Sequence, residues 1–286
     1  MSDASLVIGG SAAITAVGAA RLGLRVGLCA AFGDDDLGHI MVQRLTAEGV
    51  DSRHLRREAA QPTGISVILD EGSDRAILTA PGPVEALSTA DLAALGDAPA
   101  RHVHVASYFM LGHTTQQGLA PLLQRWRTAG VSTSVDTNWD PHQRWDVGSL
   151  LSAVDVVLPN RAELAALSGV DDLEGGLRAL AALGPSVICK LGVQGAVALT
   201  HDRVVRVAAV PSDHFVDSIG AGDSFVAGYL YGLLAGDDVG DRLRLAVATG
   251  SLSTRGRGGT AAQPDLATAR YVAQGLAVTS PAEDLR

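Results

Sequence analysis

The 286-residue sequence has little cysteine, little aromatic content and no run of basic residues. Its two cysteines, Cys29 and Cys189, lie in apolar, strand-like segments, so we expect buried, reduced thiols of a cytoplasmic protein and neither a disulfide nor a catalytic cysteine. Lys and Arg number 22 against 31 Asp and Glu, a net charge of −9. Without a basic patch, neither nucleic acid nor an anionic membrane is an expected partner.

The sequence also contains no segment that is typical of a membrane span. Residues 6–20 are uncharged, but they are rich in glycine and alanine, follow Asp3 and are closed by Arg21. A transmembrane helix needs about 20 apolar residues, and a signal peptide begins with basic residues, so we expect neither. Apolar residues make up 47% of the chain, which is ample for the core of one large domain.

Short β-branched segments alternate with longer helical ones, which predicts an α/β fold with a parallel sheet between helices. The expected strands are residues 25–31, 102–107, 132–136, 155–158 and 186–191. The expected helices are residues 11–22, 36–48, 114–129, 161–168, 173–183, 221–234, 239–253 and 264–273.

One region departs from this alternation. Residues 64–70 and 75–80 are both rich in β-branched and apolar residues, and Glu71-Gly72-Ser73-Asp74 between them is a turn sequence. This pattern predicts an antiparallel hairpin.

The segment with the clearest chemical meaning runs from Asp217 to Asp223, with the sequence Asp-Ser-Ile-Gly-Ala-Gly-Asp, and an apolar helical stretch follows it. Small residues at a helix N-terminus let an anion approach the free backbone amides, and the helix dipole favours negative charge there. A carboxylate at this place repels a phosphate unless it serves as the base for an attacking hydroxyl. Taken alone, the pattern also fits an acid in the first turn of a tightly packed helix.

This segment resembles the signature D-T-x-G-A-G-D-x-F of the ribokinase-like (PfkB) carbohydrate kinases, with Ser218 in place of threonine. Five further segments resemble motifs of the same family, in the family's order and over nearly the whole chain. They are Gly9-Gly10 with Ala20-Arg21-Leu22-Gly23, Gly33-Asp34-Asp35 with Gly49-Val50-Asp51, Asp136-Thr137-Asn138 with Trp145, Asn160 with Glu163, and Lys190 with Gly192 and Gly195. Each motif alone is weak, but six in order are strong.

The resemblance implies a three-layer αβα sandwich with a mostly parallel sheet and a small β lid. Residues 9–49 and 81–286 would form the nucleotide- and substrate-binding core, and residues 2–8 and 50–80 the lid. In this family the lid closes over the sugar and often joins two copies, so the resemblance implies a sugar substrate and a homodimer. An ordinary edge hairpin is the alternative for the lid strands.

The resemblance also assigns the phosphoryl-transfer site. Asp223 would be the general base, and the amides of Gly220, Ala221 and Gly222 would form an anion hole with that of Asp223 itself. Asn160 and Glu163 lie three residues apart on one helix face, which suits a hold on Mg²⁺ through water. A helix cap with a surface glutamate is the alternative for this pair.

The remaining assignments concern ATP, the sugar and a monovalent cation. The resemblance places Lys190, Gly192, Gly195 and Gly258 near the nucleotide, and Gly9, Gly10 and Asp223 near the sugar. A solvated lysine is the alternative for Lys190. Asp217 and Ile219, with the loop 255–260, would bind K⁺.

Asp136 and Asn138 follow a strand and either face the phosphates or form a turn. His102, His104 and His113 lack the partners of a tetrahedral metal site, so we expect them to be structural or to line the substrate.

Two features depart from the family. The opening strand that precedes the glycine pair in the family, with its sugar-binding aspartate, has no counterpart before Gly9, so we expect unpaired backbone groups and a cleft in the core. Ile14 stands where the family has an asparagine that binds sugar hydroxyls, and isoleucine cannot make that hydrogen bond.

These observations predict an ATP- and Mg²⁺-dependent kinase that phosphorylates a primary hydroxyl of a small sugar or sugar acid. A nucleoside or sugar-phosphate kinase of the same fold is the first alternative, with Arg53, Arg56, Arg57 or Arg75 as a clamp for the second phosphate. A non-catalytic nucleotide- or sugar-binding protein, truncated at its N-terminus or diverged, is the second.

Overall fold

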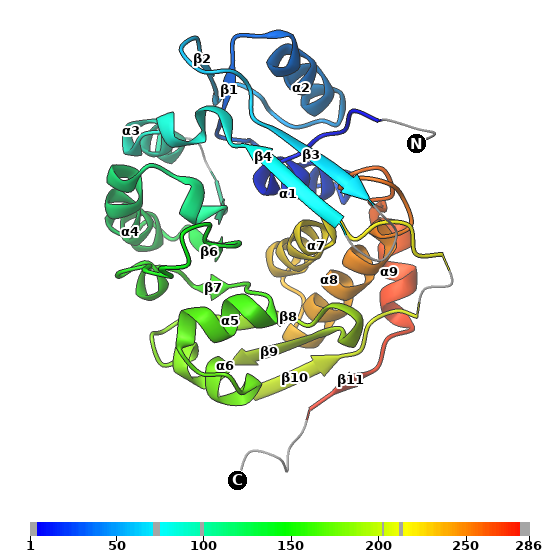
Figure 1. Cartoon of the computed structure of the whole chain (residues 1–286). Helices are drawn as coiled ribbons and strands as arrows, with labels where there is room; N and C mark the ends of the chain where they lie inside the picture. Colours follow the sequence, from blue (N-terminus) through cyan, green and yellow to red (C-terminus); the bar gives the residue numbers. More distant parts are fainter. Residues whose placement is uncertain (1–4, 71–74, 98–99, 202, 212–213, 281–286) are drawn as a thin grey trace.

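A seven-stranded sheet lies between two layers of helices (Figure 1). The computed structural model describes residues 5–70, 75–97, 100–201, 203–211 and 214–280. The strands of this sheet, in spatial order, are β11 (Val278–Thr279), β10 (Arg203–Val207), β9 (Ala196–Thr200), β8 (Ser186–Lys190), β7 (Val156–Val157), β6 (Ser132–Asp136) and β5 (His102–Ala106). Strands β5 to β8 run parallel, and β9, β10 and β11 continue the sheet in antiparallel fashion.

Two smaller sheets complete the strand inventory. One pairs β1 (Ala30–Gly33) with β2 (Leu55–Glu58) in parallel, and the other is the antiparallel hairpin of β3 (Ile65–Asp70) and β4 (Arg75–Ala80). The helices are α1 (Ser11–Arg21), α2 (Asp36–Ala47), α3 (Thr89–Ala93), α4 (His113–Thr128), α5 (Arg161–Ser168), α6 (Leu173–Ala181), α7 (Ala221–Ala235), α8 (Val239–Ser253) and α9 (Leu266–Gln274). Five short 3₁₀ turns lie between the described elements.

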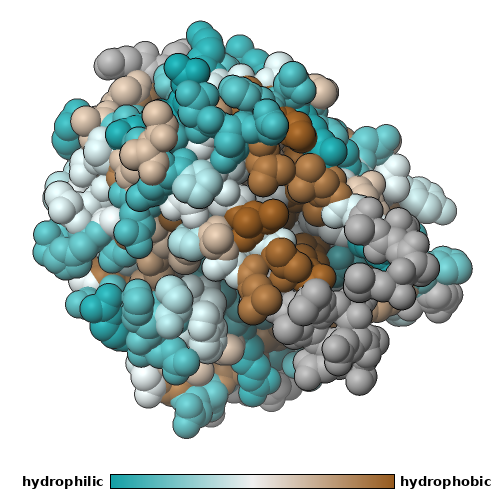
Figure 2. Space-filling view, turned by 45° about the horizontal axis from the view of Figure 1, so that its top comes forward, coloured by the Kyte–Doolittle hydropathy of each residue, from teal (hydrophilic) through white to brown (hydrophobic). Residues whose placement is uncertain are grey.

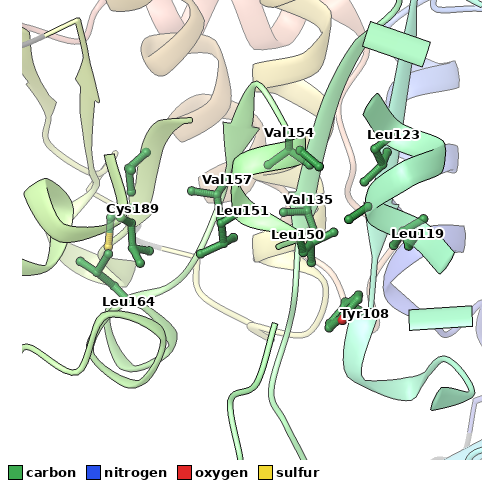
Figure 3. Close-up of a cluster of buried hydrophobic side chains, with 14 of the residues drawn as sticks. Tyr108, Leu119, Leu123, Val135, Leu150, Leu151, Val154, Val157, Leu164 and Cys189 are labelled. Carbon is green, nitrogen blue, oxygen red and sulfur yellow. The ribbon is translucent and has the colours of Figure 1, made fainter. Parts of the chain in front are cut away.

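Alternation along the central strands builds two cores, because successive side chains of a strand point to opposite faces of the sheet. Val187 and Cys189 face α4, α5 and α6, whereas Ile188 between them faces α7 and α8. Figure 3 shows part of the first core, where Val135 and Val157 lie beside Leu150 and Leu151, and Cys189 lies beside Leu164 of α5. Burial on both faces explains why β8 and β9 are largely apolar along their length.

The parallel strands bring three polar residues to one edge of the sheet. Asp136 ends β6, Asn160 follows β7 and forms a backbone bridge with Lys190, and Lys190 ends β8. The carboxyl ends of parallel strands share one edge, and ligands of open α/β sheets bind there.

The sheet is interrupted beside β5. No described strand pairs with the edge of β5 that faces away from β6, and β1 and β2 form a sheet of their own. A cavity of about 2380 Å³ lies between them, lined on one side by residues 24–31 and on the other by residues 102–107. The expected cleft in the core is therefore confirmed, and it continues towards Gly9, Gly10 and the β3–β4 hairpin.

The predicted alternation is largely confirmed, with local differences. The expected strand 25–31 is wrong in its bounds: residues 24–29 pair only at the bridge between Gly27 and Asp51, since their other edge lines the cavity, and regular pairing begins at Ala30. Helix α3 and strands β2, β9, β10 and β11 are present in the structure and were not predicted. The hairpin is confirmed by β3 and β4, while its predicted turn, residues 71–74, lies outside the described residues.

Both cysteines are free thiols in the structure. Burial raises the pKa of Cys29 to about 11 and that of Cys189 to about 12, so both stay protonated and unreactive at neutral pH. Within the described part of the chain, no helix has the length and apolar content to cross a membrane.

The interruption of the sheet predicts an alternating pattern of amide exchange along β5. Ser107 donates to Asp136 and Arg101 accepts from Ser132, so alternate amides, those of Val103 and Val105, face β6. The amides of His102, His104 and Ala106 then face the cavity. We expect the latter to exchange at least about tenfold faster in hydrogen-exchange NMR, because hydrogen-bonded core amides exchange only on opening. Equal protection of all five amides would contradict the open edge.

Candidate active site

The N-terminus of α7 is formed by a glycine turn. Gly220 precedes the helix with φ of 69°, a left-handed conformation that glycine adopts without strain. A Cβ atom on Gly220 would lie 2.6 Å from the Cα of Gly259 and 3.0 Å from the side chain of Ile14. Two loops and α1 therefore meet at this point without room for a side chain. The result is a tightly packed helix N-terminus, in which the Ala221 amide donates to the Ser218 carbonyl. The amides at the N-terminus of a helix favour an anion.

Asp223 lies in the first turn of α7 and is held by α1. Its carboxylate Oδ1 accepts a hydrogen bond from the Ser11 hydroxyl at 2.5 Å, and its backbone carbonyl accepts a weaker one from Thr15 at 3.4 Å. Burial of the carboxyl raises the pKa of Asp223 to about 7, with the Ser11 hydrogen bond opposing the rise. The charge of Asp136 adds to the rise and that of Lys190 reduces it. A carboxyl with this pKa exchanges protons near neutral pH, as a general base must.

Lys190 brings a positive charge to the same place. Its ammonium group forms an ion pair with the Asp136 carboxylate, which is only 1% exposed. A Cβ atom on Gly222 would lie 3.7 Å from Lys190 Nζ, so the ammonium group lies beside the first turn of α7. Burial opposes the charge on Lys190, but Asp136, Glu163 and Asp223 together hold its pKa above the usual value. The solvated-lysine alternative does not describe this buried cation.

Asn160 and Glu163 cap α5 reciprocally. Asn160 Oδ1 accepts from the Glu163 amide at 2.9 Å, and Glu163 Oε2 accepts from the Asn160 amide at 2.8 Å. Glu163 is buried rather than on the surface, and this burial raises the pKa of its carboxyl. The capping box leaves Glu163 Oε1 for other contacts. Within the described residues, no three His, Cys, Asp or Glu side chains are grouped to ligate a metal directly.

Asp217 joins the loop before α7 to the loop 255–260. Its Oδ1 accepts from the Ile219 amide and its Oδ2 from the Gly258 amide, each at 2.9 Å. The amides of Val216 and Asp217 both donate to the Thr254 carbonyl. The two segments that the resemblance assigned to a cation are thus in contact.

Gly9 and Gly10 line the large cavity, with open space where a Cβ would be. Gly10, with φ of 85°, is the N-cap of α1. Ile14 is buried, and its side chain fills the space that a Cβ on Gly259 would need, 2.5 Å from Ile14 Cδ1. The isoleucine thus packs beneath the glycine turns, where it supports the backbone at the start of α7.

The remaining predicted residues belong to turns and to β5. Gly192 has φ of 58° in the turn after β8, and Gly195 packs so closely on Val207–Ala209 that a Cβ would lie 2.0 Å from the Val207 carbonyl. Asn138, at φ of 55°, accepts a hydrogen bond from the Ser107 amide, so it shapes a turn. His102 and His104 bond to serines of β6, and burial lowers both pKa values to about 3.

Two contact residues were missed in the sequence. Ser11 follows the glycine pair and reaches Asp223 across 212 positions of chain. Buried Gln263 donates to the Ile14 carbonyl and to the Ser224 hydroxyl, and so ties α1 to α7. No local pattern marks either residue, because both contacts join segments that only the tertiary fold brings together.

The chain is similar to known carbohydrate kinases in sequence and in fold. The sequence profile of the family described as "pfkB family carbohydrate kinase" matches residues 1–266. A fructokinase of Klebsiella pneumoniae is 33% identical, covering 90% of this chain and 88% of its own. An ATP-dependent ribose-1-phosphate kinase of Halopiger xanaduensis is 32% identical, covering 90% and 83%. The crystal structure of a Vibrio cholerae fructokinase in a fructose-, ADP- and calcium-bound form superposes with a TM-score of 0.80 at 27% identity, covering 92% and 90%.

The glycine turn before α7 yields a matched pair of substitutions. Gly220→Ala introduces a Cβ that clashes with the Gly259 backbone, whereas Gly236→Ala, at the other end of α7 with φ of 82°, meets open space. We expect Gly236→Ala to cost about 1–2 kcal/mol of unfolding free energy for its left-handed backbone. Gly220→Ala should cost clearly more in urea denaturation, since the loops must also move apart. Equal losses would contradict the tight junction.

Proposed function

The chain belongs to the pfkB family of carbohydrate kinases, and on that footing we propose that it transfers the γ-phosphoryl group of ATP to a primary hydroxyl of a small sugar or sugar acid. Membership makes it an ATP-dependent carbohydrate kinase. The observation that carries the proposed mechanism is Asp223, a carboxyl whose pKa is raised to about 7, at the glycine-lined N-terminus of α7.

Asp223 acts as the general base in this proposal. The acceptor oxygen forms a bond to the γ-phosphorus while the bond from that phosphorus to the β–γ bridging oxygen breaks. The acceptor's proton passes to the Asp223 carboxylate, and the electron pair of the broken bond leaves with ADP. A base with a pKa near the working pH combines a large ionised fraction with adequate basicity, which favours this transfer.

Backbone amides and a lysine side chain together stabilise the negative charge of the transferred phosphoryl group. The amides of Gly220, Ala221, Gly222 and Asp223 form the anion hole, and Lys190 lies beside it. Gly192, Gly195 and Gly258 belong to the turns that would border the nucleotide.

A magnesium ion held through water by Glu163, with Asn160 beside it, would neutralise phosphate charge. The buried Glu163 and Asp136 carboxylates near Lys190 supply the oxygen donors that this ion prefers, although the capping box occupies part of the Asn160–Glu163 pair. Asp217 and Ile219 would similarly help hold K⁺ against the loop 255–260, since Asp217 already bridges these segments.

The acceptor would bind in the cavity at Gly9 and Gly10, beneath the β3–β4 hairpin. Residues 2–8 and 50–80 would form the lid over the core of residues 9–49 and 81–286, although residues 2–4 and 71–74 of this lid and residues 281–286 of this core lie outside the described part of the chain. Ile14 is buried and stands where the family has an asparagine. Sugar hydroxyls therefore have no side-chain amide to bond at this position. A small acceptor and the reduced thiols suit a cytoplasmic enzyme.

The relative that acts on ribose 1-phosphate keeps a sugar-phosphate acceptor as the second candidate. Three of the suggested clamp residues already have carboxylate partners: Arg53 pairs with Asp51, Arg56 with Asp91 and Arg57 with Asp34. These pairs must open before the arginines can clamp a second phosphate, so an acceptor without a phosphate group remains the first candidate.

We expect Asp223→Asn to abolish sugar-dependent ADP release while it preserves ATP binding. Loss of a positioned general base lowers kcat by about 10²–10⁴-fold, and asparagine keeps the size of the side chain. ADP release would be measured with pentoses, hexoses, keto-sugar acids, nucleosides and sugar phosphates, with and without K⁺. Full activity in Asp223→Asn would overturn the mechanism, and no turnover with any acceptor by the unaltered, ATP-binding chain would overturn the kinase proposal.

The exposed face of the hairpin suits contact with a second copy. Val67 lies opposite Leu78 in the register of β3 and β4, and Ile65 shares their face; these residues are 42% or more exposed, with Leu78 at 62%. Figure 2 shows apolar side chains gathered on the side of the molecule that its view brings forward. An apolar exposed patch of this kind is typical of an interaction site.

We therefore expect the chain to sediment as a dimer and Leu78→Glu to shift it towards monomer, because a charge is costly to bury at an apolar contact. Tyr271→Glu on α9 is the control, as it changes an exposed apolar residue, 80% exposed against 62% for Leu78, outside the hairpin. Analytical ultracentrifugation of both variants decides the matter. A monomeric parent chain, or a dimer that survives Leu78→Glu, would refute the lid contact.

A further inference from the structure

Ser11 stands between the large cavity and the Asp223 carboxyl. It is the first residue of α1, it lines the cavity, and its hydroxyl donates to Asp223 Oδ1 at 2.5 Å. The contact joins the first turns of α1 and α7, which pack against each other. A hydroxyl at a helix start commonly caps that helix, but α1 is capped by Gly10, without a side-chain hydrogen bond. The Ser11 hydroxyl is thus directed to Asp223.

We propose that Ser11 is a positioning residue for phosphoryl transfer: by bonding Oδ1 it orients the Asp223 carboxylate, keeps it ionised and leaves Oδ2 for the acceptor's proton. This inference rests on the proposed role of Asp223 as base. A hydrogen bond to the charged form of a carboxyl favours that form, and a bond to one oxygen fixes the rotation of the group.

The groups around Asp223 mostly disfavour its ionised form, so the hydrogen bond from Ser11 matters for the ionisation of this carboxyl. Asp136 on β6 and Glu163 on α5 both disfavour a further negative charge, as does burial, while Lys190 on β8 favours it. The Lys190 ammonium group is already paired with Asp136. Ser11 is therefore the uncharged group that counteracts burial most directly, and it does so on the side of the cavity from which the acceptor would arrive.

The direction of the effect follows from the equilibrium. In the unaltered chain the Asp223 carboxyl ionises as pH rises through about 7. Without the Ser11 hydrogen bond, the carboxylate is less favoured and the pKa of Asp223 rises further. A base that must be ionised then becomes active only at higher pH, so activity is lost at low pH and recovered at high pH.

The test is a carbon-13 NMR titration of the Asp223 carboxyl in Ser11→Ala, Ser11→Thr and the unaltered chain, without ATP. Loss of a hydrogen bond to a charged group should raise the pKa of Asp223 by about one pH unit in Ser11→Ala. Ser11→Thr keeps the hydroxyl and should restore the original titration. Alanine is the best helix former, so the alanine variant is expected to fold.

Enzyme kinetics supply the second measurement. We expect the acidic limb of the kcat/KM profile of Ser11→Ala to move up by the same interval, so that the loss of activity relative to the unaltered chain is about tenfold larger at pH 6 than at pH 9. Thr15→Val is the matched control, since Thr15 bonds the backbone carbonyl of Asp223 and not its carboxyl. Its acidic limb should stay in place.

The outcomes separate the inference from the proposed function. An unchanged Asp223 titration in Ser11→Ala overturns the positioning role, whether or not the protein is active. A uniform loss of activity at every pH, with an unchanged titration, would assign Ser11 a merely structural role. A shifted titration in a chain without kinase activity would support the Ser11 contact and refute the catalytic proposal.

Discussion

One buried ammonium group, that of Lys190, balances three carboxyl groups at the carboxyl end of the sheet. It pairs with Asp136 and interacts electrostatically with Glu163 and Asp223. Removing one partner of such a buried pair leaves an uncompensated charge and is strongly destabilising. The arrangement is possible because β6, β7 and β8 are parallel and end at the same edge, while α7 brings its N-terminus to meet them. Burial raises the pKa of Asp223, and the nearby carboxylates of Asp136 and Glu163 add to this rise.

The second constraint is the junction between α1 and α7. Ser11 and Thr15 contact Asp223, Gln263 ties Ile14 to Ser224, and Ile14 fills the space left by Gly259. Helices α1 and α7 are far apart in sequence but form one unit around the proposed base. The same unit borders the cavity that interrupts the sheet, so the place where the acceptor would bind is open towards the core as well as towards the hairpin.

Much of the fold was predictable because its signals are local. The strand 132–136 and the helices 161–168 and 239–253 match the structure in both bounds, since apolar periodicity and caps define them. Strands β9 and β10 escaped the prediction although they are apolar, because they run antiparallel at the end of an otherwise parallel pattern. The strand expected at 25–31 was displaced because its neighbour on one side is a cavity.

The candidate site, like the fold, has features that the local sequence predicts and features that it does not. Local sequence was sufficient for the glycine turn at Gly220–Gly222, the acid in the first turn of α7 and the Asn160–Glu163 pair, because backbone conformation and helix phase depend on residues a few positions apart. The tertiary structure decided which groups meet: that Ser11 reaches Asp223, that Lys190 is buried against Asp136, and that Ile14 packs beneath the glycines. Those contacts set the pKa of the proposed base. They depend on how distant segments pack, and packing is a property of the whole chain.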